Sequence, residues 1–121
     1  MDITFEPLGR IDIDGPHTFA AKLENDTIGF IYGYSLARID EKPPMFFIYS
    51  ADIYPPHQGK GYGSRFMQFV VSWAQENGFS ESFVMTERDN IAACRAYEKA
   101  GMIHNENDCD RLYVIEYGDD L

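Results

Sequence analysis

The chain has 121 residues, 45% of them hydrophobic and 15% aromatic, which is enough for one domain with its own hydrophobic core. Twenty acidic residues against ten basic ones give a net charge of -10, which disfavours binding to nucleic acid or anionic membranes and would attract cations. Two cysteines, without a CxxC or Cys/His group, exclude a disulfide scaffold and predict no metal site.

The beginning of the chain has no basic region followed by an apolar stretch, and no apolar run is long enough to cross a membrane. We therefore expect a cytoplasmic protein without a membrane partner. No linker or repeat divides the sequence, so we expect a single domain over residues 1–121.

Alternating or β-rich runs predict the strands, and the first four come before any helix. The predicted strands cover residues 2–8, 18–24, 27–37, 45–54, 80–86 and 111–117. Asn25 and Asp26 predict a tight antiparallel hairpin between the second and third. Residues 9–17 are rich in Gly, Pro and charge, so we expect only a loop there.

Two helices are predicted in the second half of the chain. The first covers 61–77, with an apolar face of Phe66, Phe69, Val70, Trp73 and Ala74 and a stop at Gly78. The second runs from a cap at Asn90 to Ala100, with Gly101 as its stop. A helix between the fourth and fifth strands implies that these two strands are parallel, so the fold class is α/β with a mixed sheet.

A glycine-rich loop reading Gln-Gly-Lys-Gly-Tyr-Gly-Ser lies between the fourth strand and the first helix, at residues 58–64. Such a loop can direct several backbone N–H groups toward one phosphate or pyrophosphate. A Walker loop is excluded because Lys60 precedes Gly61 and not Ser or Thr, and a dinucleotide fingerprint is excluded because Ser64 stands where its last glycine belongs.

The pattern Gln58-x-x-Gly61-x-Gly63 resembles the pyrophosphate motif of the GCN5-related N-acetyltransferase (GNAT) superfamily. The segment 90–102, Asn-Ile-Ala-Ala-Cys-Arg-Ala-Tyr-Glu-Lys-Ala-Gly-Met, is similar to the second motif of that superfamily in residue type and spacing. Residues 29–34, 45–49 and 86–90 look most like the type I aminoglycoside 3-N-acetyltransferases. Those enzymes tend to carry an acidic residue where this chain has Ser50.

The resemblance implies the GNAT fold in a short form, because 9–17 has no room for the two helices that usually follow the first strand. It also implies acetyl-CoA as co-substrate, held by the glycine loop and by the edge of the fourth strand where the fifth diverges from it. The cofactor-binding residues that the resemblance implies are Ala51, Ile53, Gln58, Gly59, Lys60, Gly61, Tyr62, Gly63, Ser64, Asn90 and Tyr97.

The resemblance also assigns chemistry. Tyr97 matches the tyrosine that protonates the departing thiolate in many relatives, although packing against the sheet is the alternative role. Asp52 and Glu87 are the candidates for the base that deprotonates the amine; the alternative is that both are simply exposed carboxylates at strand ends. For His57, a solvated or capping role is favoured over a catalytic one. Cys94 reads as a packed thiol, which favours direct attack in a ternary complex.

Together these features predict an acetyl-CoA-dependent N-acetyltransferase acting on a small cationic, aminoglycoside-like amine. Two alternatives stay open at this point: acetylation of a protein or peptide amine, and a non-catalytic CoA-binding regulatory module. We also expect a homodimer, because short chains with exposed strand edges and aromatic faces often pair.

Overall fold

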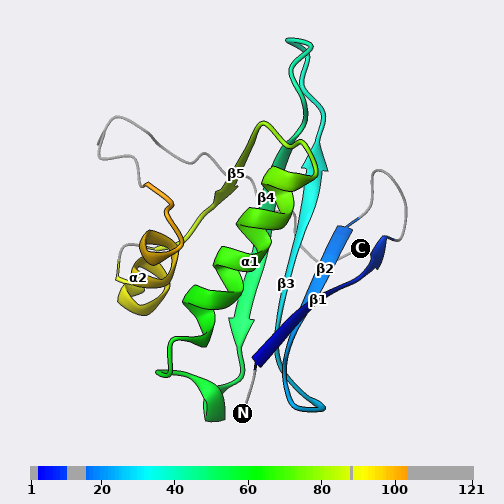
Figure 1. The fold of residues 1–121 in the computed structure, drawn as a ribbon. Helices are drawn as coiled ribbons and strands as arrows, with labels where there is room; N and C mark the ends of the chain where they lie inside the picture. The colour runs from blue at the N-terminus through cyan, green and yellow to red at the C-terminus, as the bar shows by residue number, and fades with distance from the viewer. Residues whose placement is uncertain (1–2, 11–15, 88, 104–121) are drawn as a thin grey trace, which may run out of the picture.

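The computed structural model describes residues 3–10, 16–87 and 89–103, which form one five-stranded mixed sheet and two α-helices (Figure 1). The strands are β1 (Ile3–Arg10), β2 (Pro16–Leu23), β3 (Asp26–Leu36), β4 (Met45–Ile53) and β5 (Glu81–Val84). The helices are η1 (Pro55–His57, a 3-10 turn), α1 (Tyr62–Glu76) and α2 (Ile91–Lys99). The sixth predicted strand, 111–117, lies outside the described residues.

The strands follow one another across the sheet in chain order. The pairs from β1 to β4 are antiparallel, and β4 and β5 are parallel because α1 connects them. This arrangement is the α/β mixed sheet predicted from the sequence. Only residues 11–15 separate β1 from β2, so the predicted short form, without two helices at this place, is confirmed.

Several strand boundaries differ from the sequence prediction. Residues 9–10 and 16–17 extend β1 and β2 into the expected loop, because the two strands keep pairing up to Arg10 and His17. The hairpin turn is one residue earlier than expected, at Glu24 and Asn25, and Glu24 has a φ of 57°. β5 is shorter than predicted, since its pairing with β4 ends at Val84.

The core lies between α1 and the sheet face on which it packs. The fully buried residues of α1 are Phe66, Met67, Val70 and Ala74, whereas Phe69 and Trp73 are half-buried at the side. They meet buried strand residues, of which Phe19, Phe46 and Ile48 are among the largest. The helical spacing therefore identified the buried face correctly but missed Met67.

His17, to which the sequence assigned no role, is a buried member of this core with 7% of its surface exposed. Its Nε2 lies 3.2 Å from Ser35 Oγ, and its ring lies 5.2 Å from Trp73 and 5.8 Å from Phe46. A buried polar group needs such a partner, since desolvation without a hydrogen bond is costly. The sequence did not mark it, because residues 9–17 are predicted to form a loop, and His17 is the last residue of that segment.

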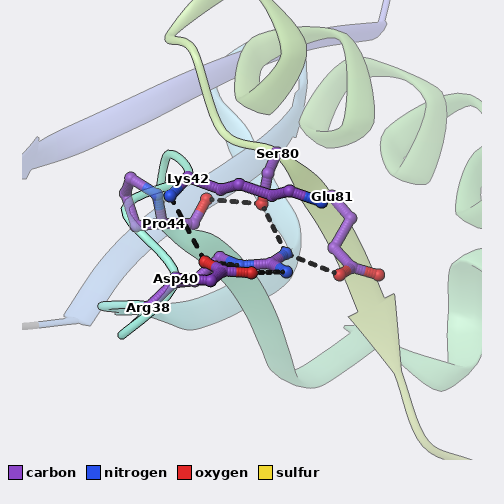
Figure 2. Close-up of polar contacts among 6 residues, drawn as sticks. All are labelled: Arg38, Asp40, Lys42, Pro44, Ser80 and Glu81. Carbon is purple, nitrogen blue, oxygen red and sulfur yellow. Dashed lines mark hydrogen bonds and ion pairs between the residues drawn. The ribbon is translucent and has the colours of Figure 1, made fainter.

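Arg38 ties the β3–β4 loop to the start of β5 (Figure 2). Its guanidinium donates to both Asp40 carboxylate oxygens, at 2.6 and 3.0 Å, and to Ser80 Oγ and Glu81 Oε1, each at 3.2 Å. Ser80 N–H also donates to the Pro44 carbonyl oxygen at 2.9 Å. These bonds hold β5 against the N-terminal end of β4, opposite to the end where the two strands diverge.

This cluster gives the stability a pH dependence. The hydrogen bond from Arg38 lowers the pKa of the Asp40 carboxyl below its ordinary value. The ionised carboxylate therefore stabilises the fold above the ordinary pKa of aspartate, and this contribution is lost as the pH falls through the lowered one. In urea unfolding, Asp40→Asn should be slightly less stable than wild type at neutral pH, and the difference should begin to shrink at about pH 4 and fade as the pH falls further.

The matched control is the same substitution in an Arg38→Met background, where it should change little at any pH because the partner is already gone. A wild-type advantage over Asp40→Asn that stays constant down to pH 2.5, or that survives in the Arg38→Met background, would contradict the role of this pair.

Candidate functional site

The site is built where β4 and β5 separate. The two strands pair only from Met45 with Glu81 to Ile48 with Val84, and β4 then continues to Ile53 without that partner. Figure 1 shows β5 turning away from β4 toward α2 beyond this point. The divergence leaves one edge of β4, residues 49–53, without a strand partner in the part of the chain that the structure describes.

A β-bulge marks the point of separation. Tyr32 pairs with Ser50 and Gly33 with Ile48, so Tyr49 is an extra residue in β4. The bulge also reverses the alternation of the strand: Phe46 and Ile48 face the core before it, and Ala51 and Ile53 pack against the core after it. Asp52 is consequently exposed on the face opposite α1.

The register fixes which backbone groups of β4 point into the opening. Tyr54 N–H donates to the Ile28 carbonyl oxygen at 2.8 Å, which makes Ile53 and Gly29 a non-hydrogen-bonded pair. The N–H groups of Ile53 and, two residues earlier, Ala51 therefore point away from β3. Asp52 belongs to the alternate, hydrogen-bonded pair with Phe30, so its backbone is directed toward β3 and only its side chain remains available.

The glycine loop forms the second wall. Gly59 and Gly61 have φ values of 78° and 81°, a left-handed backbone that other residues adopt only with strain. Gly61 is the N-cap of α1 and supplies no capping side chain, and no acidic residue lies in the first turn. The first N–H groups of α1 therefore face outward with the positive end of the helix dipole, which suits an anion such as a pyrophosphate.

Gln58 joins the loop to β4. Its side-chain Nε2 donates to the Ile53 carbonyl oxygen at 2.7 Å, across five residues of sequence. Since this carbonyl lies on the unpaired edge of β4, the bond replaces the strand partner that is missing there. The sequence assigned Gln58 to the phosphate motif but gave no sign of this contact.

The third wall comes from α2. Asn90 caps this helix, accepting a hydrogen bond from Ala93 N–H at 3.2 Å, as predicted. A Cβ added at Gly63 would lie 3.9 Å from Ile53 Cγ1 and 4.0 Å from Ala96 Cβ, so the start of α1, the end of β4 and the middle of α2 meet at one place. Tyr97, the next residue of α2, lies half-buried against the core.

The environment of Tyr97 keeps its hydroxyl protonated. Burial raises the pKa of this phenol above its ordinary value, and the neighbouring Cys94 adds to the rise. The side chain therefore holds a proton throughout the neutral range and could donate it to a strongly basic leaving group. Cys94 itself contacts the Glu87 carbonyl oxygen, with its Sγ 3.8 Å away, as a half-buried helix residue.

The predicted carboxylates are both exposed and come from different elements. Asp52 lies on β4, and Glu87 lies in the loop between β5 and α2, where its carbonyl oxygen accepts Asn90 N–H at 3.0 Å. His57 ends the 3-10 turn, and its buried Nδ1 has no hydrogen-bond partner among residues 3–10, 16–87 and 89–103. The described residues contain no group of His, Cys, Asp or Glu suited to a metal ion. Likewise, none of their helices is long and apolar enough to span a membrane.

The two kinds of glycine in this loop predict different costs of substitution. Gly61→Ala places a Cβ on a left-handed backbone and should lower the free energy of unfolding by about 1–2 kcal/mol. Gly63→Ala is the control, because Gly63 lies within α1 without a left-handed φ and its new Cβ would make only ordinary contacts. Urea unfolding of both variants tests this, and equal losses would contradict the backbone assignment.

Comparison with known proteins agrees with this architecture. Residues 2–102 match the sequence profile described as the acetyltransferase (GNAT) family. A mycothiol acetyltransferase of Nocardia farcinica is 31% identical over 70 residues, which are 58% of this chain and 23% of that protein. An uncharacterized N-acetyltransferase of Bacillus subtilis is 36% identical over 45 residues, 37% of this chain and 18% of that protein. The matched segments thus span less than a quarter of either relative.

Solved structures share the fold at lower identity. An aminoglycoside acetyltransferase from an uncultured soil metagenomic sample, in complex with sisomicin, superposes with a TM-score of 0.73 at 22% identity, covering 88% of this chain and 69% of that one. The ribosomal-protein-alanine N-acetyltransferase of Brucella melitensis gives a TM-score of 0.67 at 18% identity, covering 84% and 72%. At these identities the likeness establishes the fold.

Proposed function

Because the chain belongs to the acetyltransferase (GNAT) family, we propose that it transfers the acetyl group of acetyl-CoA to a primary amine. One observation supports the proposal: the uncapped start of α1, the edge of β4 beyond its pairing with β5 and the middle of α2, at Ala96, meet at one place. Tyr97 is the next residue of α2. Each wall supplies one of the groups that acyl transfer needs.

The residues present fit acetyl-CoA. Added Cβ atoms at Gly59 and Gly61 would have no neighbour within 4 Å, so the loop has space beside it, and Lys60 in the same loop is exposed and basic. The remaining residues of the loop, Tyr62, Gly63 and Ser64, begin α1 and offer their N–H groups to the pyrophosphate. Ala51 and Ile53 offer strand-type hydrogen bonds to the amide-bearing arm, with Asn90 at its other side.

When bound, acetyl-CoA supplies an activated thioester. The Ile53 N–H would polarise the thioester carbonyl and stabilise the oxyanion that forms there, a role whose loss typically costs a few kcal/mol. Tyr97 would donate its proton to the leaving thiolate. A primary amine has a pKa of about 10, so Asp52 or Glu87, directly or through water, would accept its proton before attack.

Binding and transfer test the proposal in two steps. Acetyl-CoA at 100 times its dissociation constant should stabilise the fold by about 2.7 kcal/mol, measured as a rise in Tm. Release of free thiol from acetyl-CoA should then depend on an added amine. No rise in Tm would reject the co-substrate, whereas a rise without transfer to any amine would favour a CoA-binding regulatory module.

Acylation of a peptide amine is the second candidate. It is favoured by the short β1–β2 connection, which supplies no helices over the acceptor side, and by the shared fold with the ribosomal-protein-alanine enzyme. A panel containing short peptides, polyamines and aminoglycosides separates the candidates by which acceptor releases CoA. The cytoplasmic location and the homodimer stay predictions.

A further inference from the structure

A group of aromatic rings lies on the sheet face opposite α1, beside the opening. The aromatic platform, as we call it, consists of Tyr32, Tyr34, Phe47, Tyr49 and Phe83. Its ring centroids form a continuous chain of contacts from β3 across β4 to β5, with spacings of 4.9 to 6.3 Å. The Phe47 and Phe83 rings are stacked, and the others are tilted or edge-on.

Tyr49 is the centre of this platform and its most accessible member. It contacts Tyr32, Tyr34 and Phe47, yet 61% of its surface is exposed. The hydroxyls of the three tyrosines form no hydrogen bond with any residue in the described ranges. Exposed aromatic rings in contact with one another are typical of a binding surface, and their hydroxyls remain available to a ligand.

The platform lies on the acceptor side of the proposed reaction. The glycine loop opens α1, which packs on the core face of the sheet, so the co-substrate would enter the opening from that face (Figure 1). An acyl group that passes the separated strands emerges on the other face. Tyr49 is the bulge residue at the point of separation, and Asp52 lies three residues beyond it on the same face.

In the described part of the chain, the carboxylate of Glu81, on the same face of β5 as Phe83, is already paired with Arg38. Asp52 is the only carboxylate in β4, and the neighbouring position 50, two residues before it on the same face, is a serine. A polycation would need several carboxylates around it, whereas one carboxylate next to several rings suits one ammonium group on a flat apolar body. Aromatic faces attract both such a body and the ammonium charge.

Resting on the acetyltransferase function proposed above, we propose that the aromatic platform is the acceptor subsite and selects monoamines carried on an aromatic ring. Tyr49 is its specificity-determining residue, and Asp52 holds the single ammonium. An aminoglycoside, with several ammonium groups on a polar body, would be the poorer acceptor.

Calorimetry on the protein saturated with CoA measures acceptor binding without turnover. The probes are 2-phenylethylamine, n-butylamine and kanamycin. We expect 2-phenylethylamine to bind about tenfold more tightly than n-butylamine, because only the former covers the rings. Tyr49→Ala should abolish this preference, and Tyr49→Phe, which keeps the ring, should retain it.

Ile39→Ala is the matched control, since Ile39 is a fully exposed apolar side chain outside the platform. Equal binding of the two monoamines, tighter binding of kanamycin, no binding of any amine, or a preference that survives Tyr49→Ala would each overturn the proposal. Failure of the proposed acetyltransferase function is detected separately, as the absence of a Tm shift with acetyl-CoA. If acetyl-CoA gives no Tm shift, the three amines are titrated into the protein without CoA, and the same results support or overturn the aromatic platform as an amine site.

Discussion

Replacing Tyr97 with phenylalanine should lower kcat by about 10² to 10⁴ while the Kd for acetyl-CoA stays nearly unchanged. The ring and its packing against the core remain, so the variant removes only the proton donor. Because burial raises the pKa of the phenol, protonation of Tyr97 should not limit the rate anywhere between pH 6 and 9 in the wild type. Steady-state turnover and calorimetric binding of acetyl-CoA measure the two quantities.

Cys94→Ala is the control for this experiment. Cys94 lies one helical turn before Tyr97 and contacts the Glu87 carbonyl oxygen, but direct attack in a ternary complex gives it no chemical role. Its substitution should leave kcat within about twofold, since a small packed thiol is replaced by a methyl group of similar size. An unchanged rate in Tyr97→Phe would reject the general acid, and a lost rate in Cys94→Ala would favour a covalent path.

Replacing Gln58 with glutamate should weaken acetyl-CoA binding by about tenfold to a hundredfold. Three effects add: the donor to the Ile53 carbonyl is lost, a carboxylate is placed against that carbonyl, and a negative charge approaches the pyrophosphate site. The edge of β4 would then lose the contact that fixes it where the described residues supply no strand partner. Calorimetry with acetyl-CoA measures the change directly.

Gln58→Arg is the matched variant. Arginine can still donate a hydrogen bond to the Ile53 carbonyl oxygen, and its positive charge suits the pyrophosphate. We expect it to keep acetyl-CoA affinity within about threefold of wild type, given that only the donor geometry changes. If Gln58→Glu binds as tightly as wild type, the side chain neither positions β4 nor lies near the pyrophosphate. If Gln58→Arg binds acetyl-CoA as weakly as Gln58→Glu, the affinity depends on the shape of the glutamine side chain and not on its hydrogen-bond donor.

Much of the fold was predictable from local patterns. Alternation identified the strands, the glycines at 78 and 101 marked the helix ends with φ values of 82° and 92°, and Asn90 caps α2 as expected. These features depend on residues close in sequence, where backbone preferences and side-chain spacing decide the outcome. The parallel pairing of β4 and β5 also followed, because a helical connection leaves little alternative.

The sequence alone determined the family and the glycine loop and predicted the reaction class, because these depend on short motifs whose spacing is local. Only the tertiary structure decided which groups face the opening. The bulge at Tyr49 turns Asp52 to the open face, the register directs the Ala51 and Ile53 N–H groups away from β3, and Gln58 reaches back to Ile53. The first two depend on how β3 and β4 align, and a shift of one residue would reverse both directions. The third depends on the turn at η1, which brings Gln58 back to the end of β4.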